Sequence, residues 1–157
     1  MAYTILLFLT RKPTISPEEF KDYWENTHIP LLQSLTGPLF PTQFTRRYLA
    51  RIHRKGFGGP ANPDRPPLLL RGTPDDFDWD AVGELTFENE KAFSQFYNTI
   101  YESDIAAKLA DDEAKFIANG SLKAVVVGET TETTRNNVCG RHDSPSAPAT
   151  LRVKSDP

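Results

Sequence analysis

The spacing of apolar and polar positions along the chain predicts an alternating series of strands and helices. A short apolar run, a period-two stretch and two later apolar segments rich in strand-forming residues predict strands at 3–10, 43–53, 79–87 and 121–129. Apolar positions at helical spacing predict helices at 17–35 and, in two pieces, at 90–118. The order is therefore β-α-β-β-α-β, the arrangement of a ferredoxin-like α+β sandwich.

A sheet of this topology carries both helices on one face, so its other face needs a cover. The predicted strands have apolar residues on both sides. A second copy of the chain is the simplest cover, with two sheets packed back to back. We therefore expect a homodimer.

The first helix contains the strongest candidate for chemistry. Ser16, Pro17 and Glu19 form a helix-start signature, with a capping serine, a proline in the first turn and a capping-box glutamate. Phe20, Trp24 and His28 then recur at steps of four, which places an imidazole on the aromatic, core-facing stripe of this helix.

This histidine has two interpretations. A neutral imidazole on an apolar face is commonly a satisfied core residue, whereas a position near a helix end, where burial and the helix dipole oppose each other, suits general acid or base catalysis. Pro30 removes a backbone donor and predicts that the helix ends or kinks just after His28.

Two segments lack regular periodicity. Residues 54–78 are rich in glycine and proline and predict a long loop, either a lid whose Phe57 and Phe77 close over a ligand or a variable surface insertion. Residues 131–157 are polar and predict a C-terminal tail that is mobile or wraps a neighbouring chain. Residues 1–130 therefore form the predicted domain.

Composition limits the classes of partner. A net charge of −3 gives no reason to expect nucleic acid or an anionic membrane. The apolar run in the first strand ends at Arg11, too early for a membrane span, and the single Cys139 fits a reducing, cytoplasmic location. His53 and His142 have no suitably spaced companions for a metal site, and no glycine-rich loop opens a helix, so we expect neither a metal nor a nucleotide cofactor.

Three stretches resemble the EthD family of the dimeric α+β barrel group. They are the Phe-x-x-Tyr-Trp-x-x-x-His-x-Pro-Leu helix at 20–31, the strand at 80–87 and the segment 111–116. The resemblance implies a ferredoxin-like domain that dimerises and holds a pocket between sheet and helices. Many fungal members resemble small, cofactor-free enzymes that decarboxylate, dehydrate or cyclise aromatic polyketides.

This resemblance assigns roles to particular side chains. His28 would carry the proton, and the pocket walls would be aromatic: Phe20, Tyr23, Trp24, Phe93 and Tyr97. Tyr48 could orient a phenol or carbonyl, or simply pack, and Arg47 could clamp an anionic group of the substrate, or pair with Glu84. Asp112 or Glu113 could orient the imidazole, or remain solvated at the end of a helix.

These assignments predict a cofactor-independent lyase, a decarboxylase or dehydratase, that acts on an aromatic polyketide in secondary metabolism. Two alternatives stay open. The same scaffold could fold its substrate as a cyclase or pericyclase, with His28 polarising a carbonyl. It could also be a dimeric binding protein without catalysis, in which His28 belongs to the core.

Overall fold

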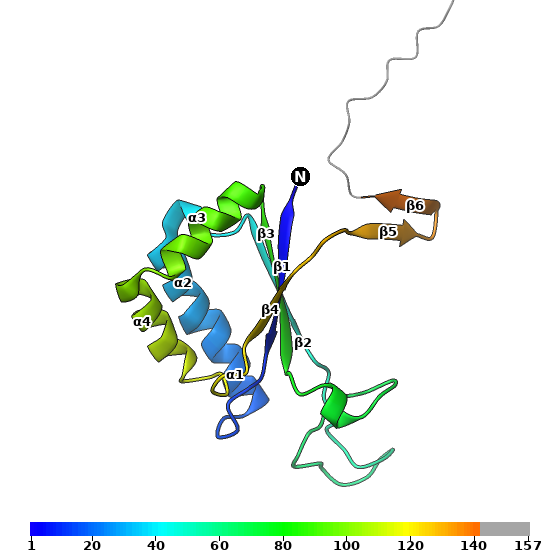
Figure 1. Cartoon of the computed structure of the whole chain (residues 1–157). Helices are drawn as coiled ribbons and strands as arrows, with labels where there is room; N and C mark the ends of the chain where they lie inside the picture. Colours follow the sequence, from blue (N-terminus) through cyan, green and yellow to red (C-terminus); the bar gives the residue numbers. More distant parts are fainter. Residues whose placement is uncertain (142–157) are drawn as a thin grey trace, which may run out of the picture.

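The computed structural model describes residues 1–141, with side chains described up to residue 136. Its centre is an antiparallel four-stranded sheet in the order β2-β3-β1-β4 (Figure 1). The strands are β1 (Tyr3–Leu9), β2 (Gln43–Tyr48), β3 (Ala81–Phe87) and β4 (Lys123–Val126). This order confirms the predicted ferredoxin-like α+β fold.

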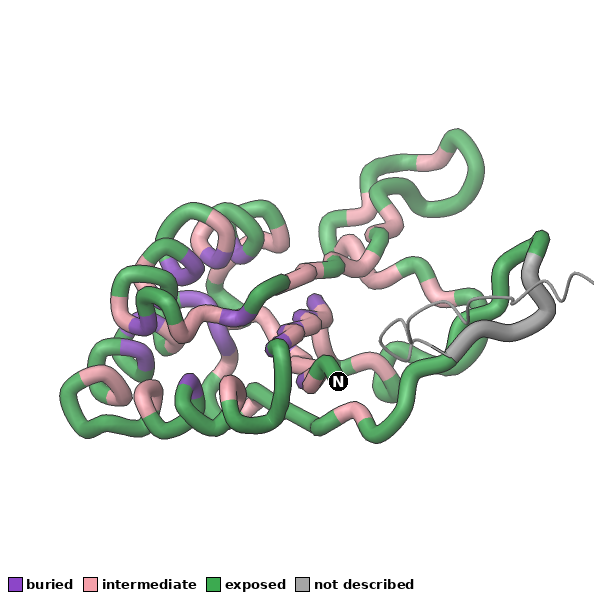
Figure 2. Tube along the Cα trace, turned by 90° about the horizontal axis from the view of Figure 1, so that it is seen from above, coloured by how far each residue is buried: buried purple, intermediate pink, exposed green. Residues whose placement is uncertain are grey.

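The helices form one layer against one face of the sheet (Figure 1). The α-helices are α1 (Pro17–Tyr23), α2 (Ile29–Thr36), α3 (Glu90–Ile100) and α4 (Ser103–Glu113), and the shorter turns are η1 (Trp24–His28), η2 (Gly37–Leu39) and η3 (Pro74–Asp76). Figure 2 shows that the buried residues concentrate between this layer and the sheet. Among residues 1–141, none of the helices combines the length and the hydropathy that a transmembrane span requires.

Side-chain caps fix where two of the helices begin. The Ser16 hydroxyl accepts a hydrogen bond from the Glu19 amide at 3.1 Å, and Pro17 occupies the first turn, as the sequence predicts. The Asn89 side chain accepts in the same way from the Ala92 amide, at 2.8 Å. Helices α1 and α3 therefore begin at residues that are fixed by side-chain caps.

The helix does not end at Pro30, contrary to one of the two predicted outcomes. It passes through the π-helical segment η1 and continues as α2 to Thr36. The Ile29 amide donates to the Trp24 carbonyl, five residues back. Since a proline has no amide to donate to the carbonyl four residues earlier, a wider turn before it keeps the helix continuous. His28 is the last residue of this turn.

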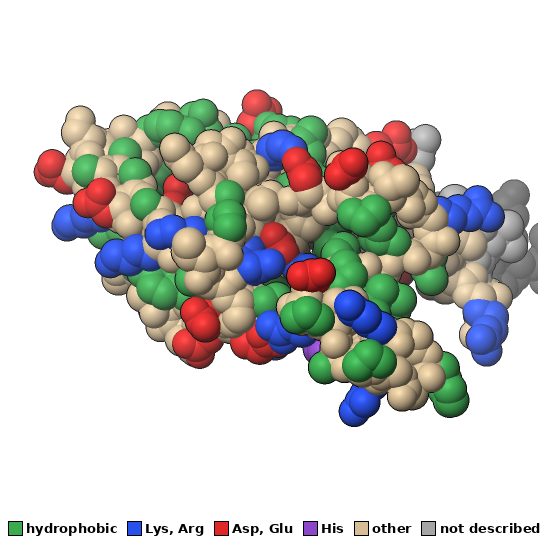
Figure 3. Space-filling view, turned by 90° about the horizontal axis from the view of Figure 1, so that it is seen from below, with side chains coloured by type: hydrophobic (Ala, Val, Ile, Leu, Met, Phe, Trp, Pro, Cys, Tyr) green, Lys and Arg blue, Asp and Glu red, His purple; other side chains and the backbone are tan. Residues whose placement is uncertain are grey.

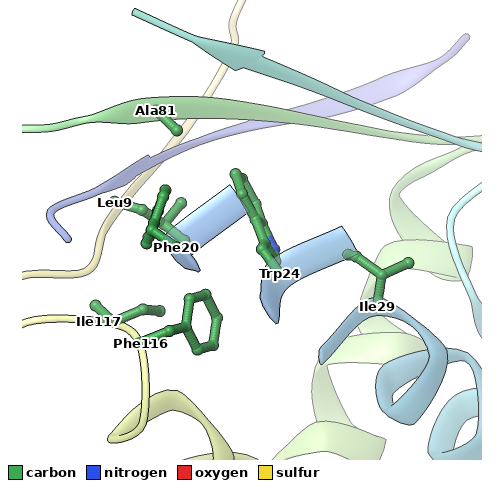
Figure 4. Packing of buried hydrophobic residues seen from close by; sticks show 7 residues of the cluster. All are labelled: Leu9, Phe20, Trp24, Ile29, Ala81, Phe116 and Ile117. Carbon is green, nitrogen blue, oxygen red and sulfur yellow. The ribbon is translucent and has the colours of Figure 1, made fainter. Parts of the chain in front are cut away.

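A tightly packed cluster anchors the helices to the sheet (Figure 4). We call it the packed cluster, and its members are Leu9, Phe20, Trp24, Ile29, Ala81, Phe116 and Ile117. Gly83 makes room for it, because a Cβ at this position would lie 3.0 Å from the Phe44 ring and 3.5 Å from the Trp24 ring. The glycine thus lets two aromatic rings lie directly on β3.

The chain departs from the sequence expectation in three places. The second strand ends at Tyr48 instead of residue 53, and beyond it only isolated bridges form, such as that between Arg51 and Pro67. The fourth strand is shorter than predicted. Part of the expected C-terminal tail forms a hairpin of β5 (Thr131–Thr134) and β6 (Asn137–Arg141). The rest of that tail, with His142, lies outside the described residues.

The long loop 54–78 lies on the side of the sheet away from the helices (Figures 1 and 2). Two ion pairs connect it to the rest of the chain: Arg65, in the middle of the loop, pairs with Glu18, and Asp78, at its end, pairs with Lys123. Phe57 is fully exposed, while Phe77 packs against Trp79. Seen from below, basic and acidic side chains are interspersed over the surface without a large patch of one sign (Figure 3).

Candidate functional site

A cavity of about 390 Å³ lies between the helix-bearing face of the sheet and helices α3 and α4. Its walls are mainly aliphatic and aromatic, with strand residues such as Leu7 and Val126 on one side and Phe93 and Tyr97 on the other. A hollow of this size and lining suits a small, largely apolar ligand. His28 is one of the few polar groups in its wall.

The imidazole of His28 is held from behind by a buried carboxylate. Its Nδ1 lies 2.9 Å from Oδ2 of Asp112, and the side chains of both residues are more than nine-tenths buried. The Tyr23 hydroxyl donates to the other oxygen of Asp112. Since an ionised carboxylate only accepts hydrogen bonds, Nδ1 carries the proton in this pair. The Nε2 lone pair is then free, and no described residue hydrogen-bonds to it.

The surroundings of His28, Asp112 and Tyr23 favour a neutral histidine. Burial lowers the pKa of His28, and the hydrogen bond to Asp112 opposes this shift only in part. Burial and the same carboxylate raise the pKa of Tyr23 to about 12, so the phenol stays a donor at neutral pH. A neutral imidazole with a lone pair on Nε2 is the form that a general base requires.

Two acidic residues at the end of α4 reach the site. Asp112 orients His28, one of the two roles that the sequence left open for it. Glu113 follows it and lines the cavity. The sequence signal was the run Asp111-Asp112-Glu113, because carboxylates are unfavourable at a helix C-terminus unless they have a specific partner.

Four of the predicted site residues line the cavity, namely Trp24, His28, Phe93 and Tyr97. Phe20 and Tyr23 do not. Phe20 is buried in the packed cluster, with ring contacts to Trp24 and Phe116, and Tyr23 acts through Asp112. The helical spacing of apolar residues predicted correctly that these side chains are buried. It cannot distinguish a side chain buried in close packing from one buried next to a cavity, because both positions are apolar in the sequence.

The two predicted site residues from the second strand have other partners. The Tyr48 hydroxyl donates to Glu25 at 2.7 Å, and Arg46 binds the same carboxylate through two nitrogens, at 2.7 and 2.8 Å. Arg47 projects from the opposite face of β2 and pairs with Glu84 at 3.0 Å, which was the structural alternative. Neither Tyr48 nor Arg47 lines this cavity, so a substrate-binding role for either residue stays a prediction.

Other expectations concern the edges of the site. Tyr101, which the sequence did not single out, lines the cavity beside Tyr97, with ring centroids 4.6 Å apart. No residue of the loop 54–78 lines it, so the role of this loop as a lid or as a surface insertion stays a prediction. Among residues 1–136, whose side chains are described, no three His, Cys, Asp or Glu side chains are grouped so that they could hold a metal ion.

Comparison with known proteins places the chain in a family. The model of the EthD domain matches residues 12–120. Solved structures with a similar fold include an Arabidopsis thaliana protein that is 12% identical, with a TM-score of 0.51 over 84% of this chain and 99% of that one. They also include an EthD family protein from Bacillus halodurans, at 17% identity and a TM-score of 0.44 over 82% and 99% of the two chains.

A DABB family protein with a ferredoxin-like fold from Mesorhizobium loti is similar at the same level, with 13% identity and a TM-score of 0.45 over 82% of this chain and 97% of that one. Among proteins with curated descriptions, none matches the sequence. At these identities the likeness to the Arabidopsis structure supports the fold alone. The chemistry has to be argued from the cavity.

Proposed function

Since the chain belongs to the EthD family, we propose that it is a cofactor-independent lyase that acts on a fused-ring aromatic polyketide, with His28 as its general base. The observation that supports this most directly is the Asp112-anchored imidazole in the wall of an apolar cavity. The apolar walls would exclude water and bind flat rings, while the free Nε2 is the atom placed for proton transfer.

The proposed chemistry starts at a carbon next to a carbonyl. Nε2 of His28 removes a proton from this carbon, and Asp112 stabilises the imidazolium that forms. Tyr23 keeps the carboxylate in place by occupying its second oxygen. In a dehydration the resulting enolate expels hydroxide. In a decarboxylation His28 instead takes the proton of the carboxyl group of a β-keto acid, carbon dioxide leaves as its bond to the alpha carbon breaks, and the imidazolium gives its proton to the carbon of the enolate that remains. A positioned base of this kind contributes about 10²- to 10⁴-fold to the rate.

The proposed assembly is a homodimer through the sheet face away from the helices, which we call the open face. The register places Leu6, Phe8, Val82 and Val125 on it. Val125 is 52% exposed, so apolar surface remains uncovered in a single chain. A second sheet packed on this face would bury it. A cytoplasmic location remains a prediction from the single cysteine.

Substitution of His28 tests the proposed activity. We would incubate the purified protein, without added cofactor, with fused-ring β-keto acids and β-hydroxy ketones and follow the product mass. Loss of carbon dioxide or water supports a lyase, and a new ring at unchanged mass supports the cyclase. His28→Gln should lose about 10²- to 10⁴-fold in rate as a lyase. The exposed His53→Gln is the matched control and should keep full activity.

The binding-protein alternative predicts a different result from the same proteins. Neither protein would then change the mass of any compound, while flat aromatic compounds would still raise the melting temperature through binding. If His28→Gln unfolds the chain and His53→Gln does not, His28 is a core residue. A folded, inactive His28→Gln variant excludes that interpretation.

A further inference from the structure

We propose that Glu113 is the general acid of the same cavity, and that the reaction it serves is loss of water from a β-hydroxy ketone. This inference rests on the proposed role of His28 as the base. It adds a second catalytic residue and selects one of the two lyase reactions. Its support is the position of Glu113 between two hollows and the absence, in the part of the chain whose side chains are described, of a hydrogen-bond or ion-pair partner for its carboxyl group.

Glu113 is the last residue of α4, and its side chain lies at a boundary. It lines the cavity that holds His28 and also an adjoining outer depression of about 610 Å³. Ile117 and Leu122 are the other residues common to both hollows. A carboxyl group at this wall can meet a ligand on the inner side and exchange protons with solvent on the outer side.

The carboxyl group of Glu113 is not used in holding the fold together. Among the side chains of residues 1–136 it has no hydrogen-bond or ion-pair partner, although the residue is half-buried. Its neighbour Asp112 binds both His28 and Tyr23. A partly buried carboxyl group without a partner is costly for stability, and such groups are concentrated at functional sites.

The groups around Glu113 set its protonation. Burial and the negative charge of Asp112 raise the pKa of Glu113. Tyr101 follows the last residue of α3, and the pKa of its phenol is raised mainly by the neighbouring Tyr97 and, as a smaller cause, by the charge of Glu113. Lys12 in the outer depression is the cation on its solvent side. A neutral base and an acid with a raised pKa in one cavity are the pair that elimination of water requires.

The proposed step balances as follows. Nε2 of His28 takes the proton from the carbon next to the carbonyl, and that electron pair forms the new carbon–carbon double bond. The bond from the β-carbon to its hydroxyl breaks, and Glu113 gives its proton to the departing oxygen, which leaves as water. Imidazolium and carboxylate then return to their starting forms by exchange with solvent through the outer depression.

The leaving group distinguishes the two lyase reactions. Carbon dioxide leaves a β-keto acid without needing a proton, so a decarboxylase needs no acid at the leaving group. Hydroxide is a poor leaving group and departs readily only when it is protonated. A second proton carrier in the wall of the cavity therefore favours dehydration.

The test uses 3-hydroxy-1-tetralone, which loses water to give 1-naphthol. In deuterated buffer, exchange at the carbon next to the carbonyl reports the base, and naphthol fluorescence reports elimination. Glu113→Gln should keep the exchange but lose elimination by about 10²- to 10⁴-fold. His28→Gln should lose both. Asp111→Asn, an exposed acid on the same helix, is the matched control and should keep both.

Each outcome decides a different claim. If the unaltered protein accelerates neither exchange nor elimination, the proposed function of His28 fails. If it accelerates both and Glu113→Gln still eliminates water at the full rate, the role of Glu113 fails alone. The pH profile gives a second check: elimination should fall at high pH as Glu113 ionises, whereas the exchange rate should not follow that fall.

Discussion

The packed cluster and the cavity contain the same kinds of side chain but serve different purposes. Around Phe20, aromatic rings meet one another with no space between, and the residue is 1% exposed. Around Phe93 and Tyr97 the rings are also in contact, at 5.5 Å between centroids, but one side of each faces a hollow and Tyr97 is 45% exposed. Aromatic residues close in space therefore do not define a pocket unless a neighbouring element leaves room.

The strongest test of this comparison is a pair of matched truncations. Phe20→Ala should lower the free energy of unfolding by about 3–5 kcal/mol, because it leaves a void in close packing. Phe93→Ala should cost about 1–2 kcal/mol, because part of its ring already faces a cavity. Chemical denaturation of both variants measures the difference. Equal losses would mean that the cavity wall is as closely packed as the cluster.

The sequence predicted the fold and part of the site, for reasons that can be traced to particular residues. Periodicity located the strands and placed Trp24 and His28 on a buried stripe. It could not separate Phe20, which packs solidly, from Phe93, which borders the cavity, because both positions look equally apolar. That distinction depends on how α3 and α4 sit over the sheet, which is a matter of tertiary packing.

The hairpin of β5 and β6 was missed for a different reason. The first of its strands, β5, is polar and threonine-rich, and the sequence of β6 has only five residues, so neither shows the longer alternation that marks a half-buried strand. The available signal was local: only Arg135 and Asn136 separate the two strands, and a two-residue connection that contains asparagine favours a tight β-turn.

Asp112→Asn should have the next largest effect, on activity more than on stability. An asparagine amide can donate to Nδ1 of His28, which would move the imidazole proton to Nε2 and remove the base. We expect a loss of at least about 10²-fold in turnover, or about 3 kcal/mol in activation free energy. Steady-state kinetics on 3-hydroxy-1-tetralone measure it, with Asp111→Asn as the control. Unchanged turnover would show that Asp112 only packs against the ring.

Acidification should reduce stability through His28. Its pKa in the folded chain is below the ordinary value of 6.5, so the unfolded chain binds the proton first as the pH falls. The stabilisation is complete above pH 6.5 and is lost as the pH falls toward the lowered pKa, by at most about 1.4 kcal/mol per pH unit.

Glu113 contributes with the opposite sign, because its pKa is raised in the folded chain. Its contribution is greatest below the ordinary value of 4.5 and is lost as the pH rises through the raised pKa. The melting temperature should therefore fall less steeply between pH 7 and pH 5 in His28→Gln than in the unaltered protein or in His53→Gln. Parallel curves for all three proteins would indicate that His28 titrates freely.

Substitution of Arg47 on the open face should have the smallest effect on the stability of a single chain. It therefore allows an effect on dimer assembly to be separated from an effect on folding. Arg47 and Glu84 form an exposed pair, so Arg47→Ala should change the free energy of unfolding by less than about 1 kcal/mol and leave the cavity untouched. If two copies pack through this face, Arg47→Glu beside Glu84 adds like charges where the sheets meet and should weaken the dimer. Sedimentation of the two variants measures this, and the mass of Arg47→Glu should move toward that of one chain as the protein is diluted. A dimer that Arg47→Glu leaves unchanged would place the contact elsewhere on the chain.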